Sequence, residues 1–415
     1  MKKNPIISII REARIDESRT PLTPNQIQTL SNKFPNLQVF VQPSKTRCFK
    51  DEDYSKAGAK IKEDISYSDI IFGVKEVEIS TLIENKTYLF FSHTSKVRKD
   101  INQATQNKAI IYKKKLLREV IKRKITLIDY ENIRETSGKG YRYLGFGRFA
   151  GIVGCYNTLN LYLKLQKEKS LPRAFEINSY EKIKKLISKQ NFNKLKILQT
   201  GRGNVAKGAM EILKYANIKQ ISINDYLNKK YNEAIFCNIS IREHVERNDG
   251  KDYSSQDFTS NPHEYKSKIK NYLFDTDMLI TGHYWEPKFP KLFYPNQINE
   301  FKNLKIIGDI TCDIDGAVPT TIRSTSIAKP YYSIDINSMK EIDLGKEGIA
   351  VMAVDNLPSE LPNESSEEFG DSIISEVLPY LINKDDGRIN RATTASRGEF
   401  CPKYKYLEDF IKQKD

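Results

Sequence analysis

Cysteine, histidine and long apolar runs are all scarce in this chain. The five cysteines are odd in number, lie far apart and form no CxxC pair, which argues against a disulfide framework or a zinc site and favours a reducing compartment. No window approaches the roughly 18 apolar residues that a membrane span needs. Arg11 and Glu12 interrupt the N-terminal apolar stretch too early for a signal peptide. We therefore expect a cytoplasmic protein with no bound metal and no membrane partner.

Acidic residues are outnumbered by basic ones, and the formal net charge is +14. Clustered Lys and Arg would indicate a polyanion partner such as a nucleic acid. The lysines of this chain instead form short runs beside acidic residues, a pattern typical of a solvated surface. The charge therefore predicts no nucleic-acid partner.

Apolar residues are plentiful enough for more than one core, since 39% of the 415 residues are hydrophobic. In the first 135 residues, short apolar runs alternate with polar, helix-like stretches, which predicts a parallel sheet with crossover helices. Thr23, Pro24 and Gln26 form a capping box and predict a helix start. The predicted strands of this part cover residues 7–10, 39–41, 70–74, 88–91, 109–112 and 125–128.

A second unit is predicted from about residue 145. The polar segment 238–276 predicts an elaborated loop or small subdomain within it. Its other predicted elements are a helix over residues 149–165, strands at 196–199, 221–223, 278–281 and 304–307, and an apolar run at 349–354.

This order of elements predicts an α/β fold with two Rossmann-like, doubly wound parallel-sheet domains and a cleft between them. We place a substrate-binding, catalytic domain at residues 1–145. A C-terminal segment from about residue 345 to 415 is expected to return to it. Residues 146–344 are then the dinucleotide-binding domain.

Residues 201–208 carry the pattern GxGxxA, directly after a predicted strand and at the start of a predicted helix. In a dinucleotide motif the first glycine allows a tight turn, the second lets the backbone approach the pyrophosphate, and alanine is tolerated in the third place. The helix N-terminus then binds the phosphates. The pattern alone also fits a plain turn, but its context favours coenzyme binding. The predicted coenzyme contacts are Gly201, Arg202, Gly203, Asn204 and Val205.

An acidic residue about twenty positions further on would accept the ribose hydroxyls and indicate NAD. Asp225, after the predicted strand at 221–223, is the candidate. If Ser222 or Asn224 holds that place, with a basic residue such as Arg202 or Lys229 nearby, the 2′-phosphate of NADP is accepted instead. The sequence therefore leaves NAD and NADP open.

Two predicted strands end near side chains that can move protons. Lys75 follows the run 70–74, and His93 follows the run 88–91. Open α/β sheets bind ligands at the carboxyl ends of their strands, where a His or a partly buried Lys can act as acid or base. Either residue alone could equally be a solvated surface group. Arg19 and Arg142 could bind a carboxylate, although such arginines more often lie on the surface.

Several segments together resemble the alanine dehydrogenase and saccharopine dehydrogenase superfamily. RTPLTP at 19–24 is similar to its opening, and FGVKE at 72–76 and FSHTSK at 91–96 resemble the lysine and histidine motifs of lysine-forming saccharopine dehydrogenase. The closer resemblance is to the lysine-ketoglutarate reductase half of aminoadipic semialdehyde synthase. It is carried by residues 201–209, 282–286, 309–313, 353–362 and 402–407.

The resemblance implies a role for each matching residue. The chain ends where the fused second half of the synthase would begin, so we expect one activity and not two. Residues 221–226 depart from the family's pattern, which again leaves the coenzyme open. The implied site residues are the acid/base pair Lys75 and His93, the carboxylates Glu76 and Glu131, the carboxylate-binding Arg19 and Arg142, the supporting Lys96, and Asp313 near the nicotinamide.

The implied activity is an NAD(P)-dependent interconversion of saccharopine with lysine and 2-oxoglutarate through an imine, in a monomer or small homo-oligomer. One alternative is an alanine-dehydrogenase-like or other amino-acid dehydrogenase, against which the segments 282–286 and 355–362 argue. Another is a non-catalytic metabolite-binding relative. The acid/base pair and the glycine loop together argue against that.

Overall fold

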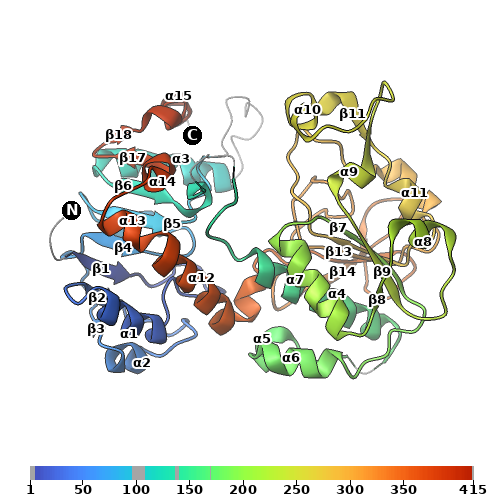
Figure 1. Ribbon diagram of the computed structural model, residues 1–415, viewed down its shortest axis with the longest axis horizontal. Coiled ribbons are helices and arrows are strands. Elements are labelled where there is room, and N and C mark those ends of the chain that lie inside the picture. The colour runs from blue at the N-terminus through green and yellow to red at the C-terminus, as the bar shows by residue number, and fades with distance from the viewer. Residues whose placement is uncertain (1–4, 96–107, 136–139, 169, 414–415) are drawn as a thin grey trace. The chain divides into compact units, whose positions relative to one another are not determined.

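The chain folds into two compact units. The computed structural model describes residues 5–95, 108–135, 140–168 and 170–413. Met1–Gly145 and Pro362–Asp415 form the first unit, and Phe146–Leu361 form the second. Figure 1 shows the blue N-terminal and red C-terminal segments together in the first unit. The chain thus returns to the first unit at Pro362, where the sequence placed the return at about residue 345.

The first unit is built on an eight-stranded sheet with the order β18-β17-β6-β5-β4-β1-β2-β3. The strands from β6 to β3 pair in parallel, and β17 and β18 of the C-terminal segment extend the sheet antiparallel. Ile7, Ser8 and Ile9 are all fully buried, as in strands covered on both faces. The strands are β1 (Ile6–Ile9), β2 (Gln38–Val41), β3 (Lys60–Ile61), β4 (Ile70–Phe72), β5 (Thr87–Phe90), β6 (Thr126–Asp129), β17 (Thr393–Ser396) and β18 (Glu399–Phe400).

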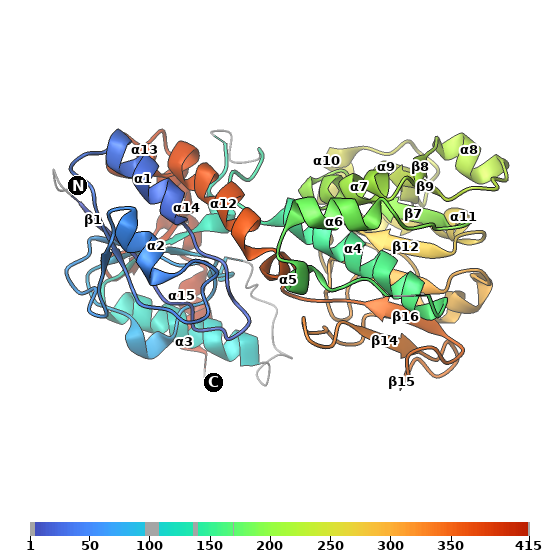
Figure 2. The same ribbon diagram turned by 90° about the horizontal axis from the view of Figure 1, so that it is seen from below.

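Helix α1 of the first unit begins at the expected capping box, because the Thr23 hydroxyl accepts from the Gln26 N–H and the Gln26 side chain accepts from the Thr23 N–H. This helix packs against α12 (Figure 2), where Gln26 Nε2 donates to the Glu367 carbonyl at 2.7 Å. The helices are α1 (Pro24–Lys33), α2 (Asp51–Lys56), α3 (Lys108–Lys122), α12 (Pro362–Glu376), α13 (Leu378–Ile382), α14 (Arg388–Ala392) and α15 (Leu407–Lys412).

The strand predicted at residues 109–112 is wrong, because these residues belong to α3. Leu116, Leu117 and Val120 are completely buried at helical spacing further along the same element. The short apolar run is therefore the first part of an amphipathic helix, and its length alone did not distinguish it from a strand.

The second unit has its own eight-stranded sheet, with the order β15-β14-β16-β13-β12-β7-β9-β8. The strands from β16 to β8 are parallel, and β14 and β15 are antiparallel. Both sheets are thus dominated by parallel pairs, which confirms the predicted α/β class. The strands are β7 (Lys196–Thr200), β8 (Lys219–Gln220), β9 (Ile235–Ile239), β12 (Met278–Thr281), β13 (Ile306–Asp309), β14 (Tyr331–Ile334), β15 (Glu341–Ile342) and β16 (Ile349–Met352).

Helices α4 and α7 of the second unit lie side by side (Figure 1), and glycines occupy their contact. A Cβ added to Gly151 would lie 1.9 Å from the Val205 carbonyl oxygen, and one added to Gly208 would lie 1.9 Å from the Arg148 carbonyl oxygen. The two backbones therefore touch directly. The helices are α4 (Gly147–Leu165), α5 (Ala174–Ile177), α6 (Tyr180–Ile187), α7 (Asn204–Tyr215), α8 (Ile223–Asn228), α9 (Ile241–His244), α10 (Ser255–Ser260) and α11 (Lys270–Leu273).

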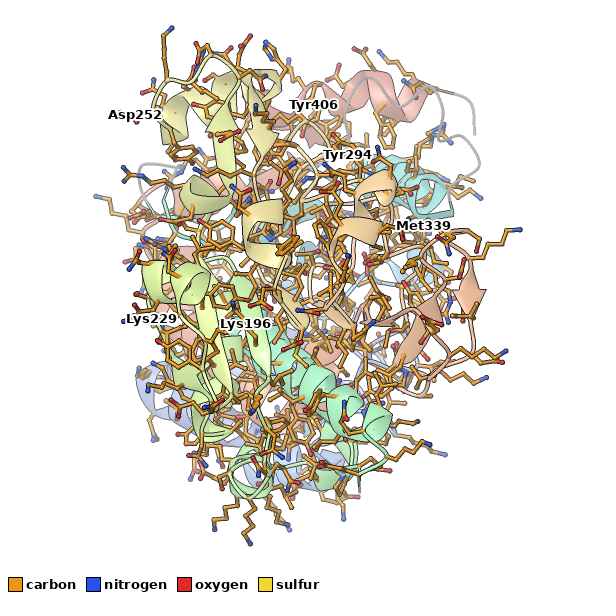
Figure 3. All side chains as sticks on the ribbon, turned by 90° about the vertical axis from the view of Figure 1, so that its right-hand side faces the viewer. Lys196, Lys229, Asp252, Tyr294, Met339 and Tyr406 are labelled. Atoms are coloured by element: carbon orange, nitrogen blue, oxygen red, sulfur yellow. The ribbon has the colours of Figure 1, made fainter. Side chains whose placement is uncertain are left out.

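The polar segment at 238–276 contains a small substructure. Strands β10 (Val245–Arg247) and β11 (Tyr265–Ser267) pair antiparallel, and Val245, Phe258, Tyr265 and Phe289 form an apolar cluster of their own. Figure 3 shows Asp252 in the exposed loop between β10 and α10. Among the described helices, none combines the length and the apolar character that crossing a bilayer requires.

Candidate active site

Three neighbouring parallel strands of the first unit end at the same edge of its sheet. Lys75 lies three residues after β4, His93 three residues after β5, and Glu131 two residues after β6. Strand β5 pairs with both β4 and β6, so these strand ends are adjacent. His93 Nδ1 lies 3.3 Å from Glu131 Oε2, and His93 Nε2 lies 3.9 Å from Glu76 Oε1. The predicted histidine is thus placed between two of the predicted carboxylates.

The His93 backbone is in the left-handed region, with φ at 51°. Few residues other than glycine adopt this conformation, and such residues are often found at functional sites. The imidazole stacks on the Phe91 ring, with 6.0 Å between the ring centroids and 19° between the planes. Its side chain is 29% exposed. The ring is therefore held by its neighbours and remains accessible to a small molecule.

Lys75 lies partly buried at the same sheet edge. Burial lowers the pKa of its ammonium group, and the positive charge of Arg19 lowers it further, against the opposing effect of Glu76 and Glu17. A lysine with a lowered pKa gives up and takes back a proton more readily near neutral pH than a free lysine does. The environment of Lys75 therefore suits the acid/base role predicted for it.

Glu12 also lies beside Lys75, although it was not among the site residues predicted from the sequence. Its Oε1 accepts the Val74 N–H at 2.7 Å, and its Oε2 accepts the Lys75 N–H at 2.9 Å. Burial and the negative charge of Glu17 raise the pKa of Glu12 to about 8. In the sequence Glu12 only marked the end of the first apolar run. Its place after β1, which pairs with β4, is the pattern that points to it.

The Arg19 guanidinium is engaged by a carboxylate of the chain itself. Arg19 Nε donates to Glu17 Oε1 at 2.8 Å, and Arg19 Nη2 donates to Glu17 Oε2 at 2.5 Å. Burial acts to raise the pKa of Glu17, but the charge of Arg19 and its hydrogen bonds outweigh this and lower it. Both side chains are almost completely buried. The sequence did not predict this internal partner.

Arg142 and Asp129 also lie beside Glu131. Arg142 Nη1 lies 3.5 Å from Glu131 Oε1. Asp129, which the sequence analysis also missed, accepts from the Ser92 hydroxyl at 2.6 Å and from the Glu131 N–H at 2.9 Å. Burial, and then the charge of Glu131, raise the pKa of Asp129. The predicted site residue Lys96 lies outside the described residues.

The glycine loop of the second unit follows β7 and leads into α7, as the pattern predicts. Gly201 has a φ of 101°, and a Cβ there would lie 2.5 Å from the Gly282 carbonyl oxygen. A Cβ at Gly203 would meet no described atom within 4 Å. Asn204 and Val205 form the first turn of α7. The open space at Gly203, beside the N–H groups of a helix start, fits the pyrophosphate of a dinucleotide.

Asp225 does not lie at a strand end. The strand predicted at residues 221–223 is wrong, because β8 ends at Gln220 and Ser222 caps α8 by accepting from the Asp225 N–H. Asp225 is in the first turn of that helix and pairs with Lys229 at 2.9 Å. Lys229 directly follows α8 (Figure 3). Ile221 follows β8 directly, and Ser222 is the next residue, whose capping hydroxyl explains why a helix starts there.

The loop after β13 contains the remaining predicted residue, Asp313, which is exposed. The fully buried carboxylate at this strand end is Asp309, which the sequence analysis did not single out. It accepts from the hydroxyls of Thr281, Thr311 and Thr321, each at 2.5 Å. Within the described parts of the chain, no three His, Cys, Asp or Glu side chains are grouped as a metal site requires.

Comparisons with known proteins place the chain in a family. Residues 8–152 match the family model described as "Alanine dehydrogenase/PNT, N-terminal domain", and residues 216–398 match "Alanine dehydrogenase/PNT, C-terminal domain". Two domains of one family are matched in order, so the chain belongs to the alanine dehydrogenase/PNT superfamily. An L-alanine dehydrogenase structure shares its fold, with a TM-score of 0.62, 15% identity and coverage of 98% of this chain and 99% of the other.

The chain is also similar to α-aminoadipic semialdehyde synthases and to saccharopine dehydrogenases. It is 30% identical to the α-aminoadipic semialdehyde synthase of Arabidopsis thaliana, over 94% of this chain and 40% of the relative. It is 29% identical to the mitochondrial synthase of Bos taurus, over 96% and 47%. It is 23% identical to saccharopine dehydrogenase [NAD(+), L-lysine-forming] of Emericella nidulans, over 97% and 95%. The chain spans less than half the length of the synthases.

Proposed function

We propose that this chain is an NAD(P)-dependent oxidoreductase that interconverts saccharopine with lysine and 2-oxoglutarate through an imine. The observation that carries the proposal is the position of His93 between Glu76 and Glu131, at the sheet edge where Lys75 also lies. A binding protein needs no such proton-handling group. The similarity to the synthases and to the fungal saccharopine dehydrogenase supports this choice of substrates.

In the reductive direction, the ε-amine of lysine attacks the ketone carbon of 2-oxoglutarate. The amine nitrogen loses two protons and the carbonyl oxygen gains two as water leaves, and His93 carries these protons between them. The nicotinamide, when bound, supplies a hydride to the imine carbon. Lys75 supplies the proton that the nitrogen takes up as the secondary amine forms. Oxidation of saccharopine reverses each step.

The two predicted arginines contribute differently to substrate binding. Arg142 is one-third exposed, so its planar guanidinium is able to bind a carboxylate of the keto acid. Arg19 is almost completely buried and is held by Glu17. Its proposed role is to keep a positive charge beside Lys75, which lowers the pKa of that lysine. Lys96 and Asp313 remain proposed supporting residues.

The coenzyme binds over the glycine loop, where Gly203 leaves open space and α7 begins. Ser222, and not an acidic residue, lies two positions after the end of β8, and Arg202 stands in the glycine loop itself. A hydroxyl and a guanidinium suit the 2′-phosphate of NADP better than they suit a free ribose hydroxyl. This arrangement favours NADP, with NAD as the alternative.

The test is an activity assay in which the amine, the keto acid and the coenzyme are varied in combination. Purified protein is incubated with NADH or NADPH, with 2-oxoglutarate or pyruvate, and with a panel of amines that includes lysine and ammonia, and the loss of reduced-coenzyme absorbance is followed. We expect turnover with lysine. Turnover with ammonia and pyruvate, and none with lysine and 2-oxoglutarate, would instead assign an alanine-dehydrogenase-like activity, which the shared fold makes the second candidate. No turnover with any combination would contradict the proposal.

A further inference from the structure

A buried pair of histidines lies behind the glycine loop. His283 follows β12, and its Nδ1 shares a hydrogen bond of 2.7 Å with the hydroxyl of Thr200, the last residue of β7. The ring of His244, the last residue of α9, lies 5.4 Å from the His283 ring at 65°. Thr200, His244 and His283 are all buried. Two of the four histidines of the chain are therefore gathered beside one strand end.

This cluster is in direct contact with the first turn of the glycine loop. The Gly282 N–H donates to the Thr200 carbonyl at 3.1 Å. A Cβ on Gly201 would lie 2.5 Å from the Gly282 carbonyl oxygen and 2.8 Å from the His283 nitrogen. The Gly201 N–H donates to the Ile239 carbonyl at 2.8 Å. The ends of β7, β9 and β12 therefore all contact the turn at Gly201. His283 forms its hydrogen bond with Thr200, the residue directly before that turn.

An imidazole is a costly choice for a purely packing role at this position. His283 Nε2 and both ring nitrogens of His244 are buried without a hydrogen-bond partner among the described residues. A buried polar atom without a partner destabilises the folded state, and an apolar ring would avoid that penalty. Burial lowers the pKa of His283 to about 3 and that of His244 to about 4. Both rings are therefore neutral near pH 7, and the contact with Thr200 joins two neutral groups.

We propose that His283 is a positioning residue for the coenzyme: its Nδ1 fixes the Thr200 hydroxyl and thereby the turn at Gly201, and His244 holds the His283 ring in place. The proposal rests on the proposed function, because the role of the glycine loop in coenzyme binding is part of that function. His283 is almost completely buried, so it acts through Thr200 and the loop backbone and does not touch the coenzyme.

The experiment measures coenzyme affinity separately from folding. His283→Leu removes the ring nitrogens, whereas His283→Asn keeps a polar atom near the position of Nδ1. The matched control is His263→Leu, since the His263 side chain is 74% exposed in the same unit. NADPH and NADH dissociation constants are taken from fluorescence titrations, and melting temperatures are recorded alongside.

We expect His283→Leu to raise the dissociation constant at least about tenfold and His283→Asn to stay within about threefold of wild type, as loss and rescue of one hydrogen bond predict. Thr200→Val should weaken binding like His283→Leu, and the double variant should bind no worse than either single one. Turnover at saturating coenzyme should change little.

Wild-type affinity in a folded His283→Leu variant, or an Asn variant as weak as Leu, would overturn the inference and leave the proposed function standing. If His283→Leu does not fold, Thr200→Val compared with Thr200→Ser decides the same question, and equal affinity of those two overturns it. A wild-type protein that binds neither NADPH nor NADH overturns the proposed function and the inference with it.

Discussion

Replacing Glu12 by Gln should stabilise the first unit at high pH, although it removes a hydrogen-bonding group of the site. Folding raises the pKa of Glu12 from its ordinary value near 4.5 to about 8. Between these two values the folded chain binds a proton that the unfolded chain has lost. The free energy of unfolding therefore falls as the pH rises through this window, by about 1.4 kcal/mol per pH unit at most. Glu12 therefore makes its full contribution to stability only below pH 4.5, where the unfolded chain is protonated as well.

The Gln side chain has no such titration, and it keeps one of the two acceptors for the Val74 and Lys75 N–H groups. The lost hydrogen bond costs about 1–3 kcal/mol at every pH. The two stability curves should therefore cross between about pH 5 and 7, and at pH 9 the variant should be more stable by about 2–4 kcal/mol. Turnover should nevertheless fall, because the turn that carries Lys75 is held less firmly.

Differential scanning calorimetry from pH 5 to 9 is the appropriate assay. The single tryptophan, Trp285, lies in the second unit, so its fluorescence does not report on the first. Glu52→Gln, on the exposed side of α2, is the matched control and should keep the wild-type slope. If Glu12→Gln shows the same dependence of stability on pH as the wild-type protein, the reasoning about the raised pKa of the Glu12 carboxyl group is refuted.

Three further outcomes follow from the site. His93→Gln and Lys75→Met should each lower turnover by roughly 10²-fold or more in steady-state assays, while the coenzyme dissociation constant stays near the wild-type value. Wild-type rates in both variants would show that the two side chains have a structural role only. Gly203→Val should raise the coenzyme dissociation constant at least about tenfold, because a side chain would enter the open space before α7; an unchanged fluorescence titration would exclude that site. Arg142→Ala should raise the KM for the keto acid by about tenfold or more with a smaller change in kcat, and an effect on kcat alone would remove its binding role.

Much of the first sheet was predictable from local pattern. Buried parallel strands are short apolar runs, and the residues after them lie at one edge, so the amino-acid sequence alone was enough to expect Lys75 and His93 near each other. The run at 109–112 shows the limit of that reasoning. A short apolar run fits a strand or a helix turn equally well, and burial on a face further along α3 decided between them.

The partners of the site residues were harder to predict, because they depend on which strands are neighbours. Glu12 binds the backbone of Lys75 across 63 positions of sequence. Arg19 has its carboxylate only two residues away, yet nothing in the local pattern distinguishes Glu17 from a solvated acid. The position of Asp225 at a strand end was mispredicted for a different reason. Strand β8 has only two residues, so the sequence contains almost no apolar pattern that marks where it ends.

The backbone contact between α4 and α7 has a consequence for large-scale mutagenesis. Gly151 and Gly208 lie in the second unit and have no place in the acid/base chemistry, yet any side chain there would overlap a carbonyl oxygen of the facing helix. A library screened only for growth or turnover would rank both glycines with His93 and Lys75. Measuring the abundance of each variant as well would separate the two groups, because glycine variants should disappear from the soluble pool while acid/base variants accumulate as inactive, folded protein.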